Sequence, residues 1–301
     1  MGSRGPVKAV PVGLTLMIFE ISHRMDFVFS GPAFFEPMTV RLHPRSDATQ
    51  VLEFYRLDVV PAPVQTTRNT GLDGNIEDTL WFSGLHPTLS LTASSRVRTF
   101  RTNPFDFLLS DSRFRTLPFS YGPVLSPLLA PYLAQSAELN KSSLFRSFIE
   151  TVRSSSKMET IPFLTGLAQK IRESFSYAVR EEGDPHSPQQ TLENGGGTCR
   201  DFALLAMEIC RFFGLASRFT GGYHVPTGTQ GEPSLHAWIE VYLPGAGWRG
   251  LDPSEALMTA DHHITLASSP LPSLTLPTEG HFRGEGSSTL ATRIAINRSS
   301  G

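Results

Sequence analysis

The stretch that decides the fold of this 301-residue chain is GGGTCRDFALLAMEICRFFG, Gly195 to Gly214. Thr198 followed three residues later by Asp201 is a capping-box pattern, so we expect a helix whose first residue is Cys199. Beyond Asp201 the segment carries only two charged residues, and a helix that is apolar on nearly all faces is buried. Gly214 supplies the left-handed residue that ends such a helix.

Cys199 occupies a position where a thiol becomes reactive. A helix N-terminus favours the thiolate and lowers the thiol pKa. The glycines before it, including Gly197, would let a substrate backbone approach the sulfur and would leave N–H groups free to stabilise an oxyanion. The residues alone also fit a small buried cysteine beside an ordinary glycine-rich turn. Cys210 is expected to be structural, because it lies three turns deeper on the same helix face.

The cysteines fit a reducing compartment. They lie eleven residues apart, about 16 Å along one helix, whereas a disulfide needs Cα atoms within roughly 7 Å. Two cysteines alone also cannot form a structural zinc site. We therefore expect a cytoplasmic protein with no metal and no cofactor. The N-terminus, basic and then apolar, imitates a signal peptide, but no small-residue cleavage site follows, so a first β-strand is favoured.

The composition describes a globular protein with enough apolar residues for real cores. It is 40% hydrophobic and 18% charged, with a formal net charge of -2. No basic run or zinc-finger spacing points to nucleic acid, and no apolar stretch reaches the length of a membrane span. At this length two domains are expected.

We expect an α+β protein that begins with a β-sandwich-like domain. Residues 1–115 hold short alternating segments broken by turn residues, which is the pattern of a sandwich. Residues 116–133 form a proline-rich connector, apolar enough to pack against both domains. Residues 134–301 form the second domain, with helices over 136–158 and 160–177. Its alternating end, LATRIAINR, is assigned to it as a last strand.

A candidate base lies on the strand LHAWIEVYLP. His236, Trp238 and Glu240 fall on one face of this alternating segment, and the other face is apolar. Trp238 is therefore a candidate for the wall of a cleft. A lone histidine on a strand is more often structural. However, Asp252 in the next strand could accept from one ring nitrogen and turn the other toward the cysteine.

The length of the turn between these strands tests that arrangement. A three-residue turn, Gly245–Gly247, pairs Asp252 with Glu240, on the face of His236. A two-residue turn pairs Asp252 with Ile239, on the opposite face. The three candidates come together only with an odd-length turn or a bulge.

The remaining candidates are weaker. His224 precedes a Gly/Pro-rich loop over residues 225–234 that could edge the cleft, although a surface position is favoured. Gln190 could supply a side-chain oxyanion donor, although an ordinary surface position is favoured. His262 and His263 are adjacent in sequence, so in a strand they point to opposite sides and cannot share a metal-binding face.

Three motifs in order resemble the bacterial transglutaminase-like family. They are GTCRDFA, then RFTGGY, then HAWIEVYLPGAGW with the DP that follows it. Upstream, RLHPR, VVPAP, GLDGN and LPFSY resemble the β-rich N-terminal domain of these bacterial proteins, so the resemblance spans about Met17 to Arg298. Where the family continues with a histidine–isoleucine strand and a G-R-D stretch, this chain has HHITLASSPLPSLTLP. A surface near the cleft is therefore expected to differ.

The resemblance implies a papain-like core in which a central helix packs on an antiparallel sheet. It implies Cys199 as nucleophile, His236 as general base and acid, and Asp252 as the orienting acid. The implied activity is acyl transfer on amide or peptide bonds of a peptide or protein substrate, through a thioester, with water or an amine as acceptor. The alternative is a binding or assembly protein that retains this fold without activity. A zinc hydrolase built on His224, His236 and a carboxylate is a third and weaker interpretation.

Overall fold

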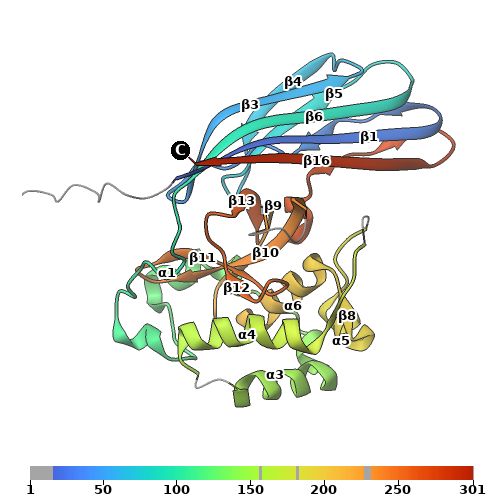
Figure 1. Ribbon diagram of the computed structural model, residues 1–301. Coiled ribbons are helices and arrows are strands. Elements are labelled where there is room, and N and C mark those ends of the chain that lie inside the picture. The colour runs from blue at the N-terminus through green and yellow to red at the C-terminus, as the bar shows by residue number, and fades with distance from the viewer. Residues whose placement is uncertain (1–15, 156–157, 181–182, 227–231, 301) are drawn as a thin grey trace, which may run out of the picture.

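The computed structural model describes residues 16–155, 158–180, 183–226 and 232–300. The molecule has two parts, a β-sandwich and a core in which helices cover a second antiparallel sheet (Figure 1). The expected α+β class is confirmed. The choice between a signal peptide and a first strand concerns mainly residues 1–15, which lie outside the described residues.

The sandwich is built on one long strand, β1 (Met17–Phe35). Its side chains alternate between buried and exposed, with Phe19 and Met25 inside, because successive strand residues point to opposite faces. β1 pairs antiparallel with β6 (His86–Thr99), and β6 pairs with β3 (Gln50–Val60). The first sheet therefore presents a regular apolar face to the interior.

A second sheet closes the sandwich, with strand order β14–β2–β5–β4. The inner faces of both sheets form one hydrophobic cluster, which also takes in Tyr223 and Ile264 from the sheet of the core. The two parts of the molecule thus share apolar contacts. The bounds are β2 Met38–Val40, β4 Gln65–Thr70, β5 Ile76–Trp81 and β14 Thr278–Glu279.

The last strand belongs to the sandwich and not to the core. β16 (Ser288–Ser300) pairs antiparallel with β1, and β15 (Phe282–Arg283) pairs with the far end of β1. The structure thus differs from the expected division, which gave residues 134–301 to the second domain. The alternation of LATRIAINR predicted a strand but could not name its partner. The free edge of β1 supplies the backbone hydrogen bonds that this strand needs.

The core packs α6 (Cys199–Phe212) against a five-stranded sheet of order β12–β11–β10–β9–β13. Nearly every residue of α6 is buried, as its apolar composition predicts. The other bounds are η2 Leu139–Lys141, α3 Ser143–Ser155, α4 Thr160–Ser174, β7 Ser176–Tyr177, α5 Pro188–Asn194, β8 Gly196–Gly197, β9 Ser217–His224, β10 Ser234–Leu243, β11 Gly247–Asp252, β12 Leu257–Met258, β13 His263–Ser269 and η3 Pro272–Thr275.

The connector packs against both parts. The hydroxyl of Tyr121 donates to the carbonyl of Tyr242 at 2.8 Å and accepts from the N–H of Ala216 at 2.9 Å, both in the core. The hydroxyl of Tyr132 donates to Oδ1 of Asp73 in the sandwich at 2.6 Å. These contacts place the connector as its apolar composition predicts. It contains α1 Gly122–Leu128 and α2 Ala130–Leu133, and η1 Ser112–Arg115 precedes it.

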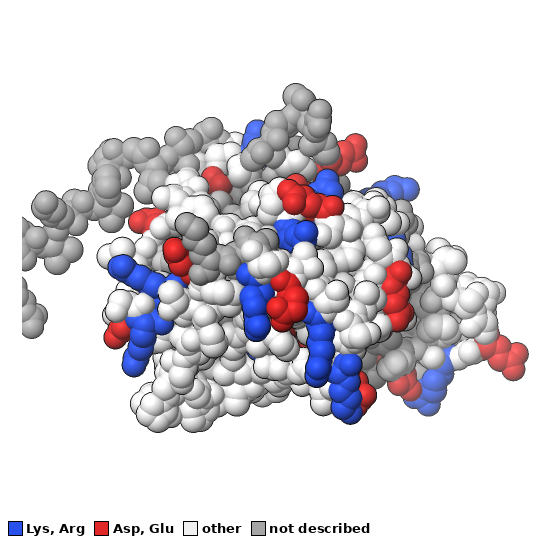
Figure 2. Space-filling view, turned by 90° about the horizontal axis from the view of Figure 1, so that it is seen from below, with Lys and Arg blue, Asp and Glu red and all other residues white. Residues whose placement is uncertain are grey.

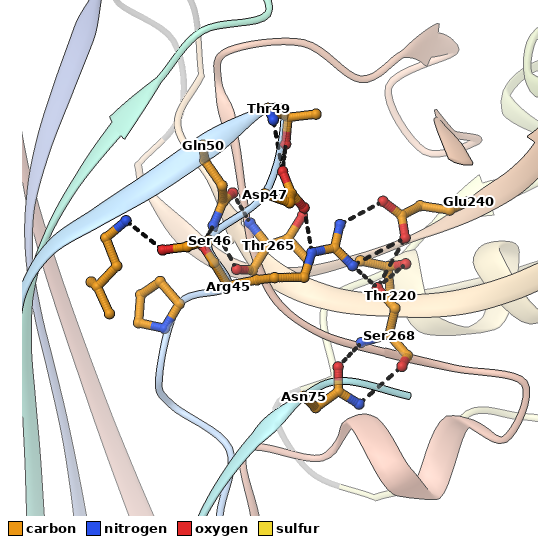
Figure 3. Close-up of polar contacts among 12 residues, drawn as sticks. Arg45, Ser46, Asp47, Thr49, Gln50, Asn75, Thr220, Glu240, Thr265 and Ser268 are labelled. Carbon is orange, nitrogen blue, oxygen red and sulfur yellow. Dashed lines mark hydrogen bonds and ion pairs between the residues drawn. The ribbon is translucent and has the colours of Figure 1, made fainter. Parts of the chain in front are cut away.

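A buried polar network joins the sandwich to the core (Figure 3). Arg45, which follows β2, donates to Oε1 of Glu240 on β10 at 2.9 Å. The other oxygen of Glu240 lies 2.7 Å from the guanidinium of Arg218 on β9. The side-chain amides of Gln50 and Asn75 bond to backbone groups of β13. The network therefore fixes β10, the strand that also carries the candidate base.

Charged side chains are interspersed on the face of the core seen from below (Figure 2). Acidic and basic groups neighbour one another there, and the described residues form no broad surface of one sign on that face. This is unlike the continuous basic footprint that nucleic-acid binding uses. Within the described part of the chain, no helix combines the length and the apolarity needed to cross a membrane.

Candidate active site

The fold places Cys199 at the first position of the buried helix α6. Thr198 is the N-cap, and its N–H donates to Oδ2 of Asp201 at 2.7 Å, which completes the predicted capping box. The guanidinium of Arg180 lies 2.9 Å from the other carboxylate oxygen of Asp201 and balances its charge. Cys199 is 9% exposed, so its thiol lies at the edge of the interior rather than deep within it.

The three glycines before the thiol are explained by local packing. Gly195 ends α5 in the left-handed region, with φ +62°. A Cβ at Gly196 would lie 2.6 Å from the carbonyl oxygen of Ser176, and one at Gly197 would lie 2.7 Å from Oδ2 of Asp201. The sequence interpretation was that these glycines make room for a substrate. In the structure their first role is to let β8 and the N-terminus of α6 pack closely.

His236 and Asp252 meet as the alternation of their strands predicts. Nε2 of His236 lies 2.8 Å from Oδ2 of Asp252. The strands pair Leu243 with Gly247, so the turn has three residues, as the arrangement requires. The turn lies between Leu243 and Gly247 and so begins one residue earlier than expected. In the same register, Asp252 lies opposite Trp238 rather than opposite Glu240. Both positions lie on the face of His236.

Asp252 is fully buried and accepts hydrogen bonds on both oxygens. Oδ1 accepts from the N–H of Ser254 at 2.9 Å and from its hydroxyl at 2.6 Å, and Oδ2 accepts from His236 and His263. Burial alone would raise the pKa of this carboxyl. The charge and hydrogen bond of His236 and the hydrogen bond from His263 outweigh burial and hold the pKa of Asp252 well below its usual range.

Cys199 and His236 form the other half of the site. Nε2 of His236 is engaged by Asp252, which leaves Nδ1 for the hydrogen bond to Cys199. Burial would raise the pKa of the Cys199 thiol, but the bond and charge of His236 and the N–H of Ala237 outweigh it and lower that pKa. Burial would lower the pKa of His236, whereas Asp252 and Cys199 raise it well above its usual value. The arrangement favours a thiolate–imidazolium pair.

Cys210 has the opposite environment on the same helix. It is fully buried, and burial raises the pKa of its thiol. The two cysteines therefore differ as the sequence predicts, one beside an imidazole and one enclosed by apolar side chains.

The sequence interpretation missed His263. His263 lies on β13, the strand that pairs with β9, and its Nε2 lies 3.0 Å from Oδ2 of Asp252. His262 and His263 do point apart, as adjacent strand residues must, but His263 points into the site by itself. His236, Asp252 and His263 bring one potential ligand atom each to within 4.8 Å of one another, although these atoms are already hydrogen-bonded among themselves. Strand alternation alone could not have located His263 in the site, because the sequence does not reveal the partner strand of β13.

His224 and Trp238 line the buried side of the site. His224 was expected on the surface; it is 9% exposed, and its ring stacks on His263 with centroids 4.6 Å apart. Burial and the neighbouring imidazoles lower the pKa of His224 to about 3. Trp238 is 1% exposed and meets the ring of His263 edge to face at 5.1 Å. The loop after His224 lies in part outside the described residues.

Gln190 does not reach the site. Its side-chain oxygen accepts from the N–H of Ser187 at 2.9 Å and caps α5. A different side chain, Tyr177 on β7, hydrogen-bonds to Cys199. Strand periodicity could not point to Tyr177, because the short parallel pairing of β7 with β8 joins segments about 20 residues apart.

Comparison with known proteins identifies the two parts of the chain. Residues 146–253 match the transglutaminase-like superfamily, and residues 19–98 match the bacterial transglutaminase-like N-terminal region. An uncharacterized protein of Mycobacterium leprae (strain TN) is 23% identical over 287 residues, which cover 93% of this chain and 98% of that protein. An uncharacterized protein of Mycobacterium tuberculosis (strain H37Rv) is 25% identical over 269 residues, or 82% of each chain.

A solved structure shows the same fold. It is that of a "Putative Cysteine Protease" from Cytophaga hutchinsonii, which is 17% identical, has a TM-score of 0.70, and covers 95% of this chain and 91% of its own. The resemblance seen in the sequence motifs is thus confirmed: the chain carries the core of the transglutaminase-like superfamily together with the N-terminal region of its bacterial members.

Proposed function

We propose that the protein is a cysteine-dependent acyl-transfer enzyme that acts on amide or peptide bonds through a thioester. One observation carries the proposal: the hydrogen-bonded chain from Cys199 through His236 to Asp252, in which Nε2 of His236 lies 2.8 Å from the carboxylate. The membership of the core in the transglutaminase-like superfamily supports it. Such a chain fixes the imidazole in the orientation that activates a thiol.

The residues divide the chemistry between them. The thiolate of Cys199 forms a bond to the carbonyl carbon, and the electron pair of the C=O bond moves to the oxygen. When that pair returns, the C–N bond breaks and the imidazolium of His236 gives its proton to the leaving amine. The buried carboxylate of Asp252 stabilises the imidazolium without taking its proton.

The thioester is then resolved by a second nucleophile. Neutral His236 accepts the proton of the attacking water or amine, and collapse of the second tetrahedral species releases Cys199 as thiolate. Water gives a peptidase or amidase, and an amine gives a transglutaminase. The substrate that this chemistry needs is a peptide or protein with an accessible amide carbonyl.

The proposal is tested by trapping the thioester. Purified protein is mixed with a peptide library, with and without a primary amine, quenched in acid and analysed by intact and peptide mass spectrometry. We expect an acyl adduct on Cys199 and transfer of that acyl group to water or to the added amine. Cys199→Ala should abolish the adduct, and Cys210→Ala should keep it. A wild-type protein that forms no adduct with the library would instead favour the non-catalytic binding or assembly protein.

A further inference from the structure

We propose that Tyr177 is a catalytic residue of this site, whose hydroxyl donates a hydrogen bond to the oxyanion formed when Cys199 attacks a carbonyl. The inference rests on the proposed acyl-transfer function and deepens it, because it names a side-chain donor for the oxyanion, which neither the thiol nor the imidazole supplies. It is carried by the position of Tyr177, a half-exposed side chain that interacts with the thiol.

The backbone holds Tyr177 in place next to the nucleophile. β7 and β8 pair in parallel, with Tyr177 opposite Gly197, two residues before Cys199. The N–H of Ser176 donates to the carbonyl of Gly195 at 3.0 Å, and the N–H of Ala178 donates to the carbonyl of Gly197 at 2.9 Å. Two hydrogen bonds therefore flank Tyr177, and its backbone cannot shift without disturbing the segment that leads into α6.

The side chain of Tyr177 is directed to the thiol. Its ring meets the ring of Phe202 edge to face, with centroids 6.1 Å apart, and its hydroxyl hydrogen-bonds to Cys199. Phe202 is fully buried one turn along α6, so it provides a firm support for the ring. Tyr177 is 45% exposed, whereas Cys199 is 9% exposed. Of these two side chains, Tyr177 is thus the one more open to solvent, from which a substrate carbonyl would approach.

The hydroxyl of Tyr177 remains a donor in the working range of pH. Partial burial, together with the charge of Cys199 and the hydrogen bond to it, raises the pKa of Tyr177. A protonated phenol held beside a thiolate gives a proton to a hydrogen bond and keeps its own O–H bond. When the thiolate becomes a thioether in the tetrahedral species, the negative charge moves to the former carbonyl oxygen. The donor that served the sulfur is then free to serve that oxygen.

Two other candidates for a side-chain donor, both named by the sequence, are not placed for this role. Gln190 caps α5 through Ser187, and Trp238 is buried behind the imidazoles. At the N-terminus of α6, the N–H of Cys199 belongs to the first turn, whose amides have no partner within the helix. A backbone N–H from α6 and the hydroxyl of Tyr177 would together make a two-donor oxyanion pocket.

The test is a one-atom deletion, Tyr177→Phe, with Tyr132→Phe as the matched control. Tyr132 is also a partly buried tyrosine with a bonded hydroxyl, but it lies on α2 and bonds to Asp73. p-Nitrophenyl acetate serves as the acyl donor, since its leaving group is coloured and the acetyl thioester on Cys199 is visible by mass spectrometry. Alkylation by iodoacetamide is measured in parallel, because that reaction uses the same thiolate and forms no oxyanion.

We expect Tyr177→Phe to lower the rate of acylation by about 10²- to 10³-fold, the usual effect of removing one oxyanion donor. Alkylation of Cys199 should change by less than about threefold, which is small beside that loss. Tyr132→Phe should keep both rates. Two results would overturn the inference: an acylation rate like that of the wild type, or equal losses of acylation and alkylation, which would mean that Tyr177 only holds the thiol. If the wild-type protein itself forms no acetyl thioester, the acyl-transfer function fails, and that outcome is distinct from both.

Discussion

Nε2 of His263 lies 3.0 Å from Oδ2 of Asp252, the same oxygen that accepts from His236. Two imidazoles therefore converge on one atom of a carboxylate whose other oxygen is held by Ser254. The hydrogen bond from His263 thus helps to hold this carboxylate in one orientation.

We predict that His263→Ala lowers the free energy of unfolding by about 1.5–3 kcal/mol, the range for a hydrogen bond to a charged group. The reason is that a fully buried carboxylate loses one of its hydrogen-bond donors. Urea denaturation measures the change. His262→Ala is the control, because its ring is partly exposed and lies 3.7 Å from Asp261, and its loss should be smaller. Equal losses in the two variants would contradict the assigned role.

The glycines before the nucleophile give a second prediction. Gly197→Ala would place a Cβ 2.7 Å from Oδ2 of Asp201, so the carboxylate must shift and its hydrogen bond to Thr198 weakens. We expect a loss of about 1–3 kcal/mol in the free energy of unfolding and slower alkylation of Cys199. Gly195→Ala is the matched comparison. It introduces left-handed strain at φ +62°, costing about 1 kcal/mol, but meets no atom within 4 Å. Alkylation that slows equally in both variants would argue against this explanation.

Much of the site could be predicted because it depends on local rules. The capping box set the first residue of α6, and strand alternation with an odd-length turn set His236 and Asp252 on one face. These features need only neighbouring residues along the chain. The α+β class and the sandwich strands followed from the same kind of periodicity.

The parts that could not be predicted depend on which strands become neighbours. β16 has the pattern of an ordinary alternating strand, yet its partner is β1, and the register pairs Met17 with Ser300, at opposite ends of the chain. His263 and Tyr177 reach the site through pairings of β13 with β9 and of β7 with β8. A single sequence contains the propensity of each segment to form a strand, but not the identity of the segment that satisfies its hydrogen bonds.

The network between the two parts gives a third prediction. Glu240 is buried between Arg45 and Arg218, so Glu240→Gln leaves Arg218 without its carboxylate partner and leaves Arg45 with Asp47 alone. We expect a loss of about 3–5 kcal/mol in the free energy of unfolding, measured in urea. Asp58→Asn is the control, since its pair with Arg56 is exposed and should contribute less than about 1 kcal/mol. A loss for Glu240→Gln as small as that for the control would show that the network does not hold the parts together.

The carboxylate of Glu240 also predicts how the free energy of unfolding depends on pH. Burial would raise the pKa of Glu240, but the charges of Arg218 and Arg45 outweigh it and lower that pKa far below the usual value. A lowered native pKa stabilises the folded state above the unfolded value of about 4.3, and this stabilisation is lost as the pH falls. The free energy of unfolding should therefore decrease from about pH 5 downward. The decrease should be shallower in Glu240→Gln, and parallel curves for variant and wild type would contradict it.

The two cysteines of α6 give the last prediction, because one helix carries a lowered and a raised thiol pKa. Iodoacetamide reacts with the thiolate, so Cys199 should be labelled much faster than Cys210, and at pH 6 faster than a free thiol. Residue-resolved mass spectrometry follows both sites in one sample. Equal, slow labelling of the two cysteines would refute the thiolate at Cys199.

Variants of His236 and Asp252 separate the causes of the low pKa of the Cys199 thiol. His236→Ala removes the hydrogen bond and charge that lower the pKa of Cys199 while burial continues to raise it, so the rate–pH profile should move to higher pH. Asp252→Asn should move the profile in the same direction but less far. The imidazole remains but loses the charge that raises its pKa, while the thiol loses the direct effect by which Asp252 raises the pKa of Cys199. The helix N-terminus is unchanged in both variants. If neither profile moved, the helix alone would account for the reactivity of Cys199, and the imidazole would have no part in activating it.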